Sequence, residues 1–437
     1  MSDPERLEAE LSRFRNQKAR PQPSFGTAHI RKALVELGDP QDRMPPAIHI
    51  TGTNGKGSTG AFIRAMAEAA GLSVHVFTSP HLVRVNERIR VASKLVEDEE
   101  LADVLADIWD RTEDLTYFEA LTAAAFCLFA HTRADLSVIE VGAGGATDAT
   151  NVMARPVACV VTPISRDHEA MFGVSGVAAI ARLKAGIFRE NVPAIIAEQP
   201  RLALGVLREE ARTAAAPVSL SGEDWRAAWD GEAFVYESSH LKVRSPWLGL
   251  QGRHQAENAG AACATLEAVG DPRISSAAMA AGLRETTWPA RLQKLKRGPL
   301  VGDTDIWVDA AHNPGGAAVL AEAIRAAGPG GATDKIALII AMQGAKDVQA
   351  ILSELAPVVD EIIACDLPPS GGQEGGPGMP PDQLAGIARG LGAQAMTAHD
   401  FSGAIALARA RGAGRIYVCG SLYLCGAILA ANDQTIS

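Results

Sequence analysis

The sequence lacks the cysteine spacing of a disulfide-stabilised or zinc-binding protein. Its 437 residues include six cysteines, and no two of them form a C-x-x-C pair. They are scattered and lie mostly inside apolar runs, as reduced core thiols do: Cys127, Cys159, Cys263, Cys365, Cys419 and Cys425. We therefore expect a reduced, cytoplasmic protein.

The sequence also lacks a segment suited to a membrane. The longest apolar stretch, residues 120–130, is much shorter than the ~20 residues that span a bilayer. Residues 1–20 alternate charged side chains with leucine and phenylalanine and contain no apolar core, so they do not resemble a secretory signal. We expect no membrane partner.

Positive charge is not in excess. The chain has 41 lysines and arginines against 51 aspartates and glutamates, which gives a formal net charge of −10. Such a chain lacks the broad basic field that steers binding to nucleic acid. We expect no nucleic-acid partner.

What is present is a regular alternation of strand-like and helix-like segments. Strand-like runs in the first part of the chain cover residues 48–50, 74–77, 136–141 and 157–162. Those in the second part cover residues 306–310, 335–341, 361–365 and 415–420. Because alanine-rich segments of helical length separate them, the pattern predicts an α/β fold with mainly parallel sheets.

The pattern also predicts two domains. A proline in Trp288-Pro289-Ala290 interrupts the alternation between the two series, so we predict a larger domain over residues 1–290 and a smaller, Rossmann-like α/β domain over residues 291–437. Residues 225–248 alternate apolar and polar side chains around turn residues. This predicts an antiparallel hairpin attached to the first domain.

The strongest local signal is a glycine loop between a strand and a helix. Residues 48–50 are followed by Thr51-Gly52-Thr53-Asn54-Gly55-Lys56-Gly57-Ser58 and then by apolar residues at helical spacing. Glycines let backbone N–H groups turn toward phosphate oxygens, the helix N-terminus adds its positive dipole end, and Lys56 can neutralise phosphoryl charge. The strict G-x-x-x-x-G-K-[ST] pattern is not met, because Ile50 replaces its first glycine and Gly57 separates Lys56 from Ser58. Alone, the loop fits both a phosphate-binding loop and an ordinary glycine-rich turn.

Further segments follow this loop in a characteristic order. The first half continues with T-S-P-H-L at residues 78–82, N-E-R-I at 86–89, T-Y-F-E at 116–119, E-V-G at 140–142, D-A-T-N at 148–151, D-H at 167–168 and K-A-G-I at 184–187. The second half adds H-Q at 254–255, W-P at 288–289, D-A-A-H-N-P at 309–314 and G-S-L-Y at 420–423. The whole set resembles the folylpolyglutamate synthase/dihydrofolate synthase family of the Mur ligase superfamily, in particular its bifunctional bacterial type.

The resemblance implies a P-loop, Mur-ligase-like ATPase domain followed by a smaller C-terminal domain, with ATP and Mg²⁺ as cofactors. It implies that ATP is bound by Gly52, Thr53, Asn54, Gly55, Lys56, Gly57, Ser58, Asn258, Arg291, Asp309 and His312. It implies that the metal is held by Ser79, Glu140, His168 and Lys184, with the lysine carbamylated.

The resemblance further assigns catalytic roles to Lys56, His168 and Lys184. It assigns the pteridine of the substrate to Thr116, Phe118, Asp148 and Ala149. Taken without the resemblance, several of these residues have simpler interpretations: Lys184 as a solvated surface lysine, Glu140 as a carboxylate pointing into solvent, Phe118 as a core residue and Asp309 as part of a turn.

Five positions depart from the family pattern. Ala146 stands where an arginine is usual, Leu183 replaces a glutamate, Ala290 and Ala310 each replace a glycine, and Arg166 stands where an apolar residue is usual. The phosphate, metal and adenine elements are retained better than these neighbours. The departures make a shifted substrate preference conceivable.

The sequence therefore predicts an ATP-dependent ligase that adds L-glutamate to dihydropteroate, to folates or to both, through an acyl phosphate. Another amide ligase of the superfamily, acting on a muramoyl peptide, is the alternative. A P-loop kinase and a nucleotide-binding regulatory module are more distant ones. We expect a monomer whose partners are small molecules.

Overall fold

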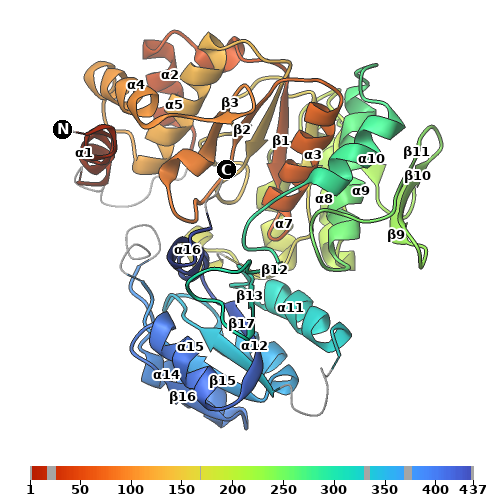
Figure 1. The fold of residues 1–437 in the computed structure, drawn as a ribbon. Coiled ribbons are helices and arrows are strands. Elements are labelled where there is room, and N and C mark those ends of the chain that lie inside the picture. Colours follow the sequence, from red (N-terminus) through yellow and green to blue (C-terminus); the bar gives the residue numbers. More distant parts are fainter. Residues whose placement is uncertain (1, 17–25, 168, 329–334, 369–375, 435–437) are drawn as a thin grey trace. The chain divides into compact units, whose positions relative to one another are not determined.

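The chain folds into two units (Figure 1). The computed structural model describes residues 2–16, 26–167, 169–328, 335–368 and 376–434. The first unit comprises the residues up to His81 together with Val85–Gly249 and Gln255–Thr287. The second comprises Leu82–Arg84, Leu250–His254 and the residues from Trp288 onward.

The first unit is built on an eight-stranded sheet in the order β4-β3-β2-β5-β1-β6-β7-β8. Six neighbouring strands run parallel, and β3 and β4 extend one edge in antiparallel pairing. The strands are β1 (Ala47–Thr51), β2 (Val74–Phe77), β3 (Ile89–Val91), β4 (Lys94–Leu95), β5 (Leu136–Glu140), β6 (Ala158–Val161), β7 (Ala194–Ile196) and β8 (Val218–Leu220). The prediction of a mainly parallel α/β sheet is confirmed for this unit.

Helices cover this sheet. They are α1 (Asp3–Asn16), α2 (Ala28–Glu36), α3 (Lys56–Ala69), α4 (Asp98–Arg111), α5 (Tyr117–His131), α6 (Glu169–Phe172), α7 (Val177–Ala185), α8 (Arg201–Thr213), α9 (Gln255–Val269) and α10 (Ser276–Glu285). The long apolar run found in the sequence lies in α5, a helix buried among α1, α2 and α4. Its apolar character is therefore that of a core helix.

Helices α3, α9 and α10 pack side by side (Figure 1). Gly282 of α10 lies so close to the backbone of Met66 in α3 that a β-carbon there would overlap it. Two helices can approach this closely only where one of them carries no side chain. The packing holds α3, and with it the helix end that follows the glycine loop, firmly in place.

Residues 225–248 form a three-stranded antiparallel sheet rather than the predicted hairpin. Its order is β11-β10-β9, with β9 (Trp225–Trp229), β10 (Phe234–Ser238) and β11 (Lys242–Ser245). The second turn contains neither glycine nor proline. It is held instead by the Ser238 hydroxyl, which accepts the backbone N–H groups of His240 and Leu241 at 3.1 and 3.0 Å. Such a turn carries a weak sequence signal.

The second unit has a six-stranded sheet in the order β12-β13-β17-β14-β15-β16. Its strands are β12 (Gln293–Lys294), β13 (Asp305–Val308), β14 (Lys335–Ile340), β15 (Glu361–Ala364), β16 (Ala395–Thr397) and β17 (Ala413–Cys419), of which only the β12–β13 pair is antiparallel. Its helices are α11 (Pro314–Ala326), α12 (Val348–Leu355), α14 (Pro381–Gly390), α15 (Phe401–Ala410) and α16 (Leu422–Ala431). In both units, no helix of the described ranges is long and apolar enough to cross a membrane.

Candidate active site

The glycine loop joins the end of β1 to the start of α3. Gly55 precedes the first helical residue, Lys56, with a φ of 87°, and no described side chain caps the helix there. The first-turn N–H groups of α3 are therefore available to an anion, and the helix dipole favours one. Gly52 also has a positive φ, of 145°, and a β-carbon at Gly52 or Gly55 would overlap Thr162 or Asn258, respectively. The structure thus requires both glycines and places Asn258 against the loop.

The loop is fastened to the segment that follows β6. The Thr53 hydroxyl donates to the carbonyl oxygen of Ser165 at 3.0 Å and accepts the Ser165 N–H at 3.1 Å. Asn54 donates its side-chain amide to the Ser165 hydroxyl at 3.2 Å, and the backbone N–H groups of Thr53 and Asn54 both reach the carbonyl of Pro163. These bonds fix the loop without using Lys56.

Ser165 was missed by the sequence analysis. Its position directly after a predicted strand, at the sheet edge that carries the other polar residues, was the available signal.

Lys56, Glu140 and Lys184 meet beside the loop. The Nζ atom of Lys56 lies 3.7 Å from Oε1 of Glu140, at the end of β5, and Nζ of Lys184 donates to the carbonyl oxygen of Gly52 at 2.7 Å. Glu140 and Lys184 are only 5% and 6% exposed. The solvent-facing interpretations of both residues are therefore wrong.

The charge on Lys184 is unfavourable in this environment. Burial, followed by the neighbouring positive charge of Lys56, lowers the pKa of the Lys184 ammonium from 10.5 to about 7. Asp148 and Asp167 act in the opposite direction but do not outweigh these two effects. Lys184 therefore exchanges its proton near neutral pH.

Two of the predicted metal ligands, Ser79 and Glu140, lie at one edge of the sheet. Ser79 follows β2, which pairs in parallel with β5, so Ser79 and Glu140 emerge at the same edge. His168 lies outside the described residues. Within the described ranges, no group of three or more histidine, cysteine, aspartate or glutamate side chains is arranged to hold a metal ion.

The predicted pteridine residues lie on two elements. Thr116 caps α5 through a reciprocal arrangement with Glu119, whose carboxylate accepts the Thr116 N–H at 2.8 Å. Phe118 is the second residue of that helix, and its ring lies against Gly142. A β-carbon at Gly142 would overlap the ring. Asp148 and Ala149 are buried in the loop that follows β5. The glycine brings Phe118 close to the backbone of that loop.

The loop over residues 142–151 is itself tied to α7, which carries Lys184. Ala146 donates its N–H to the carbonyl oxygen of Leu183 at 2.9 Å, and a β-carbon at Gly186 would overlap Ala146. Asn151 donates its side-chain amide to the carbonyl oxygens of Ala146 and Gly186, each at 3.1 Å. Two of the five departures from the family pattern, Ala146 and Leu183, are thus direct neighbours.

Two further departures, Ala290 and Ala310, are also paired. In the second unit, Ala310 donates its N–H to the carbonyl oxygen of Ala290 at 3.0 Å. Ala290 has a φ of 54°, a conformation that costs a residue with a β-carbon about 1 kcal/mol. The glycine usual in the family would adopt it without this cost.

Arg291, Asp309 and His312 all belong to the second unit. The Asp309 carboxylate accepts the N–H groups of Leu292 and Ala311 at 2.7 and 2.9 Å. Burial raises the pKa of Asp309, and the charge of Arg291 opposes the rise. His312 places Nδ1 2.8 Å from the carbonyl oxygen of Ala310. Their contacts with a nucleotide stay a prediction.

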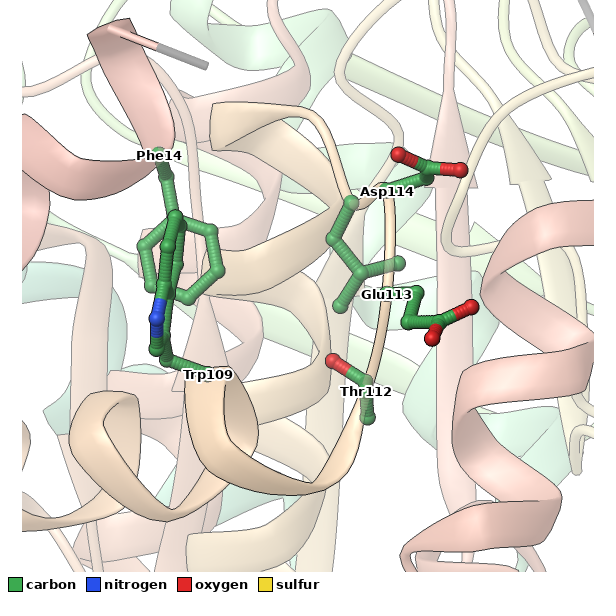
Figure 2. Close-up of a pocket in the computed structure, with 6 residues that line it drawn as sticks. Phe14, Trp109, Thr112, Glu113 and Asp114 are labelled. Carbon is green, nitrogen blue, oxygen red and sulfur yellow. The ribbon is translucent and has the colours of Figure 1, made fainter.

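A separate cavity of about 280 Å³ lies in the first unit, between α1, α4 and the segment that leads to α5 (Figure 2). Figure 2 shows Phe14 and Trp109 on one side and Glu113 and Asp114 on the other. None of the predicted site residues lines this cavity. It has no part in the arrangement around Lys56.

Comparison with known proteins supports the family that the motifs indicated. The Mur ligase middle domain model matches residues 50–266, and the model of the dihydrofolate synthetase C-terminal domain matches residues 299–431. The dihydrofolate synthase/folylpolyglutamate synthase of Bacillus subtilis is 34% identical over 317 residues, which are 69% of this chain and 72% of that protein. The chain belongs to the folylpolyglutamate synthase/dihydrofolate synthase family.

Solved structures of this family share the fold. Escherichia coli FolC in complex with DHPP and ADP matches with a TM-score of 0.87 and 28% identity, covering 98% of this chain and 97% of that one. A bifunctional folylpolyglutamate synthase/dihydrofolate synthase with Mn, AMPPNP and L-glutamate bound matches with a TM-score of 0.83 and 27% identity, covering 97% of each chain. The predicted family and its Mur-ligase-like fold are confirmed.

Proposed function

We infer that this chain is an ATP-dependent ligase that joins L-glutamate to a carboxylate of a folate. Membership of the folylpolyglutamate synthase/dihydrofolate synthase family supports the reaction. The observation that carries it to this chain is the grouping of Lys56, Glu140 and Lys184 beside an uncapped helix N-terminus. A phosphate chain, a divalent cation and a transferred phosphoryl group would each find a suitable partner there.

The reaction proceeds in two steps. In the first, the substrate carboxylate attacks the γ-phosphate of ATP, so that an acyl phosphate forms and ADP leaves. In the second, the amine of L-glutamate attacks the acyl carbon, loses a proton and expels phosphate. Lys56 holds a positive charge at the loop, where negative charge builds up on the transferred group.

The residues fit a magnesium ion. Mg²⁺ is usually held by one or two carboxylates together with waters and substrate phosphates. Glu140 provides one buried carboxylate, and Ser79 provides a hydroxyl at the same edge of the sheet. When bound, the ion would offset the negative charge of the phosphates during transfer.

Lys184 would join this site as a carbamate. A neutral amine is the form that adds to carbon dioxide, with loss of one proton, and the lowered pKa of Lys184 makes that form available at neutral pH. The product carries carboxylate oxygens in place of an ammonium. We expect the intact protein to gain the mass of carbon dioxide in bicarbonate buffer and Lys184→Ala not to gain it. A small carboxylic acid should partly restore activity to that variant, whereas bicarbonate alone should not.

We propose that the chain performs both glutamate additions, to dihydropteroate and to folates. Both use the same activated carboxylate, so one phosphate site serves them. The second substrate is longer by one glutamate, and its ring must therefore bind farther from the γ-phosphate. The chain retains the residues that the family uses for the pteridine: Thr116, Phe118, Asp148 and Ala149. This supports a dihydropteroate pocket nearer to the γ-phosphate.

One assay tests this proposal. The purified protein is incubated with ATP, Mg²⁺, L-glutamate and either dihydropteroate or tetrahydrofolate, and the products are identified by mass. We expect each substrate to gain one glutamyl group for every ADP released. Turnover of tetrahydrofolate without turnover of dihydropteroate would restrict the chain to folylpolyglutamate synthesis.

Other outcomes would favour the alternatives. Amide formation on a muramoyl peptide would indicate the other branch of the superfamily. A phosphorylated product without consumption of glutamate would indicate a kinase, and nucleotide binding without turnover would indicate a regulatory module. A monomeric state and a cytoplasmic location stay predictions.

A further inference from the structure

A buried polar chain runs from the middle of β1 to the loop that follows β5. It consists of His49, Thr150 and Asp148, which are 1%, 0% and 6% exposed. The resemblance assigned a role to Asp148 alone. When three polar side chains are buried together, each hydrogen-bond donor must face an acceptor.

An ionised Asp148 carboxylate can only accept hydrogen bonds, and this assigns a direction to each hydrogen bond in the series. The Thr150 hydroxyl donates its single hydrogen to Oδ1 of Asp148 at 2.6 Å. Nε2 of His49 lies 2.9 Å from the same hydroxyl oxygen. Because that hydroxyl hydrogen is already donated, Nε2 of His49 must carry a hydrogen and donate it. Burial lowers the pKa of His49 to about 3, which keeps the ring neutral.

The Asp148 carboxylate is held on both oxygens. Oδ1 accepts the Thr150 N–H at 3.0 Å in addition to the hydroxyl, and Oδ2 accepts the Ala143 N–H at 2.9 Å. The plane of the carboxylate is therefore fixed relative to the loop. A carboxylate recognises a flat heterocycle through N–H donors that must lie near its own plane, so its orientation decides which ring it accepts.

We propose that His49 is a positioning residue for substrate recognition. Acting through the Thr150 hydroxyl, it sets the orientation of the Asp148 carboxylate toward the aminopyrimidinone of the folate substrate. The inference rests on the proposed function, in which Asp148 receives the pteridine. It assigns a part in substrate recognition to a strand residue that lies outside the predicted ATP and pteridine residues.

The test separates recognition from stability. Thr150→Val removes the hydroxyl and keeps the shape of the side chain, whereas Thr150→Ser keeps the hydroxyl. His49→Leu removes the ring N–H at the other end of this hydrogen-bonded series. It replaces Thr150→Val in the test if that variant does not fold. Thr265→Val is the matched control, because Thr265 is equally buried and its hydroxyl donates to the Ala261 carbonyl oxygen within α9.

For each variant, kcat and the KM values for dihydropteroate, tetrahydrofolate, ATP and glutamate are measured together with the melting temperature. We expect Thr150→Val and His49→Leu to raise the KM for the pteridine substrates about tenfold, with the KM for ATP changed less than about twofold. Thr150→Ser should restore the wild-type KM. Thr265→Val should lower the melting temperature without changing any KM.

Two results would overturn the inference while leaving the proposed function standing. One is an unchanged pteridine KM in folded Thr150→Val or His49→Leu. The other is an equal rise in all KM values, as a general structural defect would cause. A wild-type protein that ligates no glutamate to any pteridine would overturn the proposed function and this inference together.

Discussion

The neutral state of buried His49 predicts a specific loss of stability in acid. Its pKa is lowered from 6.5 to about 3, chiefly by burial and secondarily by Arg189. Since the folded pKa lies below the unfolded one, the unfolded chain binds more protons between these values. The free energy of unfolding therefore falls as the pH drops below 6.5.

Replacing His49 by glutamine removes the titration and retains an N–H donor near the position of Nε2. About pH 5 is ~1.5 units below the unfolded pKa. There, proton binding to the unfolded histidine lowers the free energy of unfolding of the wild type by about 2 kcal/mol, at 1.36 kcal/mol per unit; this is the wild-type penalty. At about pH 7.5 the penalty is close to zero. His49→Gln should therefore gain about 2 kcal/mol on the wild type between these two pH values.

Urea unfolding at both pH values measures this difference. All other titrating groups are shared by the two proteins, so their contributions cancel in the comparison. His240→Gln is the matched control, because it makes the same substitution at an exposed histidine. A constant difference between His49→Gln and the wild type at the two pH values would refute the assignment of a buried neutral histidine.

Three further predictions concern activity and stability. Lys56→Ala should fold normally and lose about 100- to 1000-fold in kcat, because a charge-stabilising donor in a dry site is worth about 3 to 4 kcal/mol; near-normal turnover would contradict the loop assignment. Glu361→Gln should lower the free energy of unfolding by about 2–3 kcal/mol in urea, because this fully buried carboxylate accepts hydrogen bonds from Lys335 and Arg411 at 2.6 and 2.7 Å. Phe118→Ala should reduce kcat/KM for dihydropteroate more than for tetrahydrofolate, and equal losses would argue against a separate nearer pocket.

The sequence by itself determined the local architecture of this protein. A strand, a glycine loop and a helix follow from residue spacing and from the conformations that only glycine adopts at Gly52 and Gly55. The placing of Glu140 and Ser79 at one sheet edge was also predictable, since the carboxyl ends of parallel strands share an edge. The order of the motifs was sufficient to identify the family.

The tertiary structure decided which distant groups touch. Lys184 reaches the carbonyl of Gly52 across 132 residues, and His49 reaches Thr150 across 101. Both contacts depend on the sheet order, in which β1 lies between β5 and β6. Spacing and periodicity describe only residues that are close along the chain. The local sequence around a side chain is the same whether that side chain faces water or a residue far away in the sequence. The burial that lowers the pKa of Lys184 and His49 arises only when those strands and helices have packed.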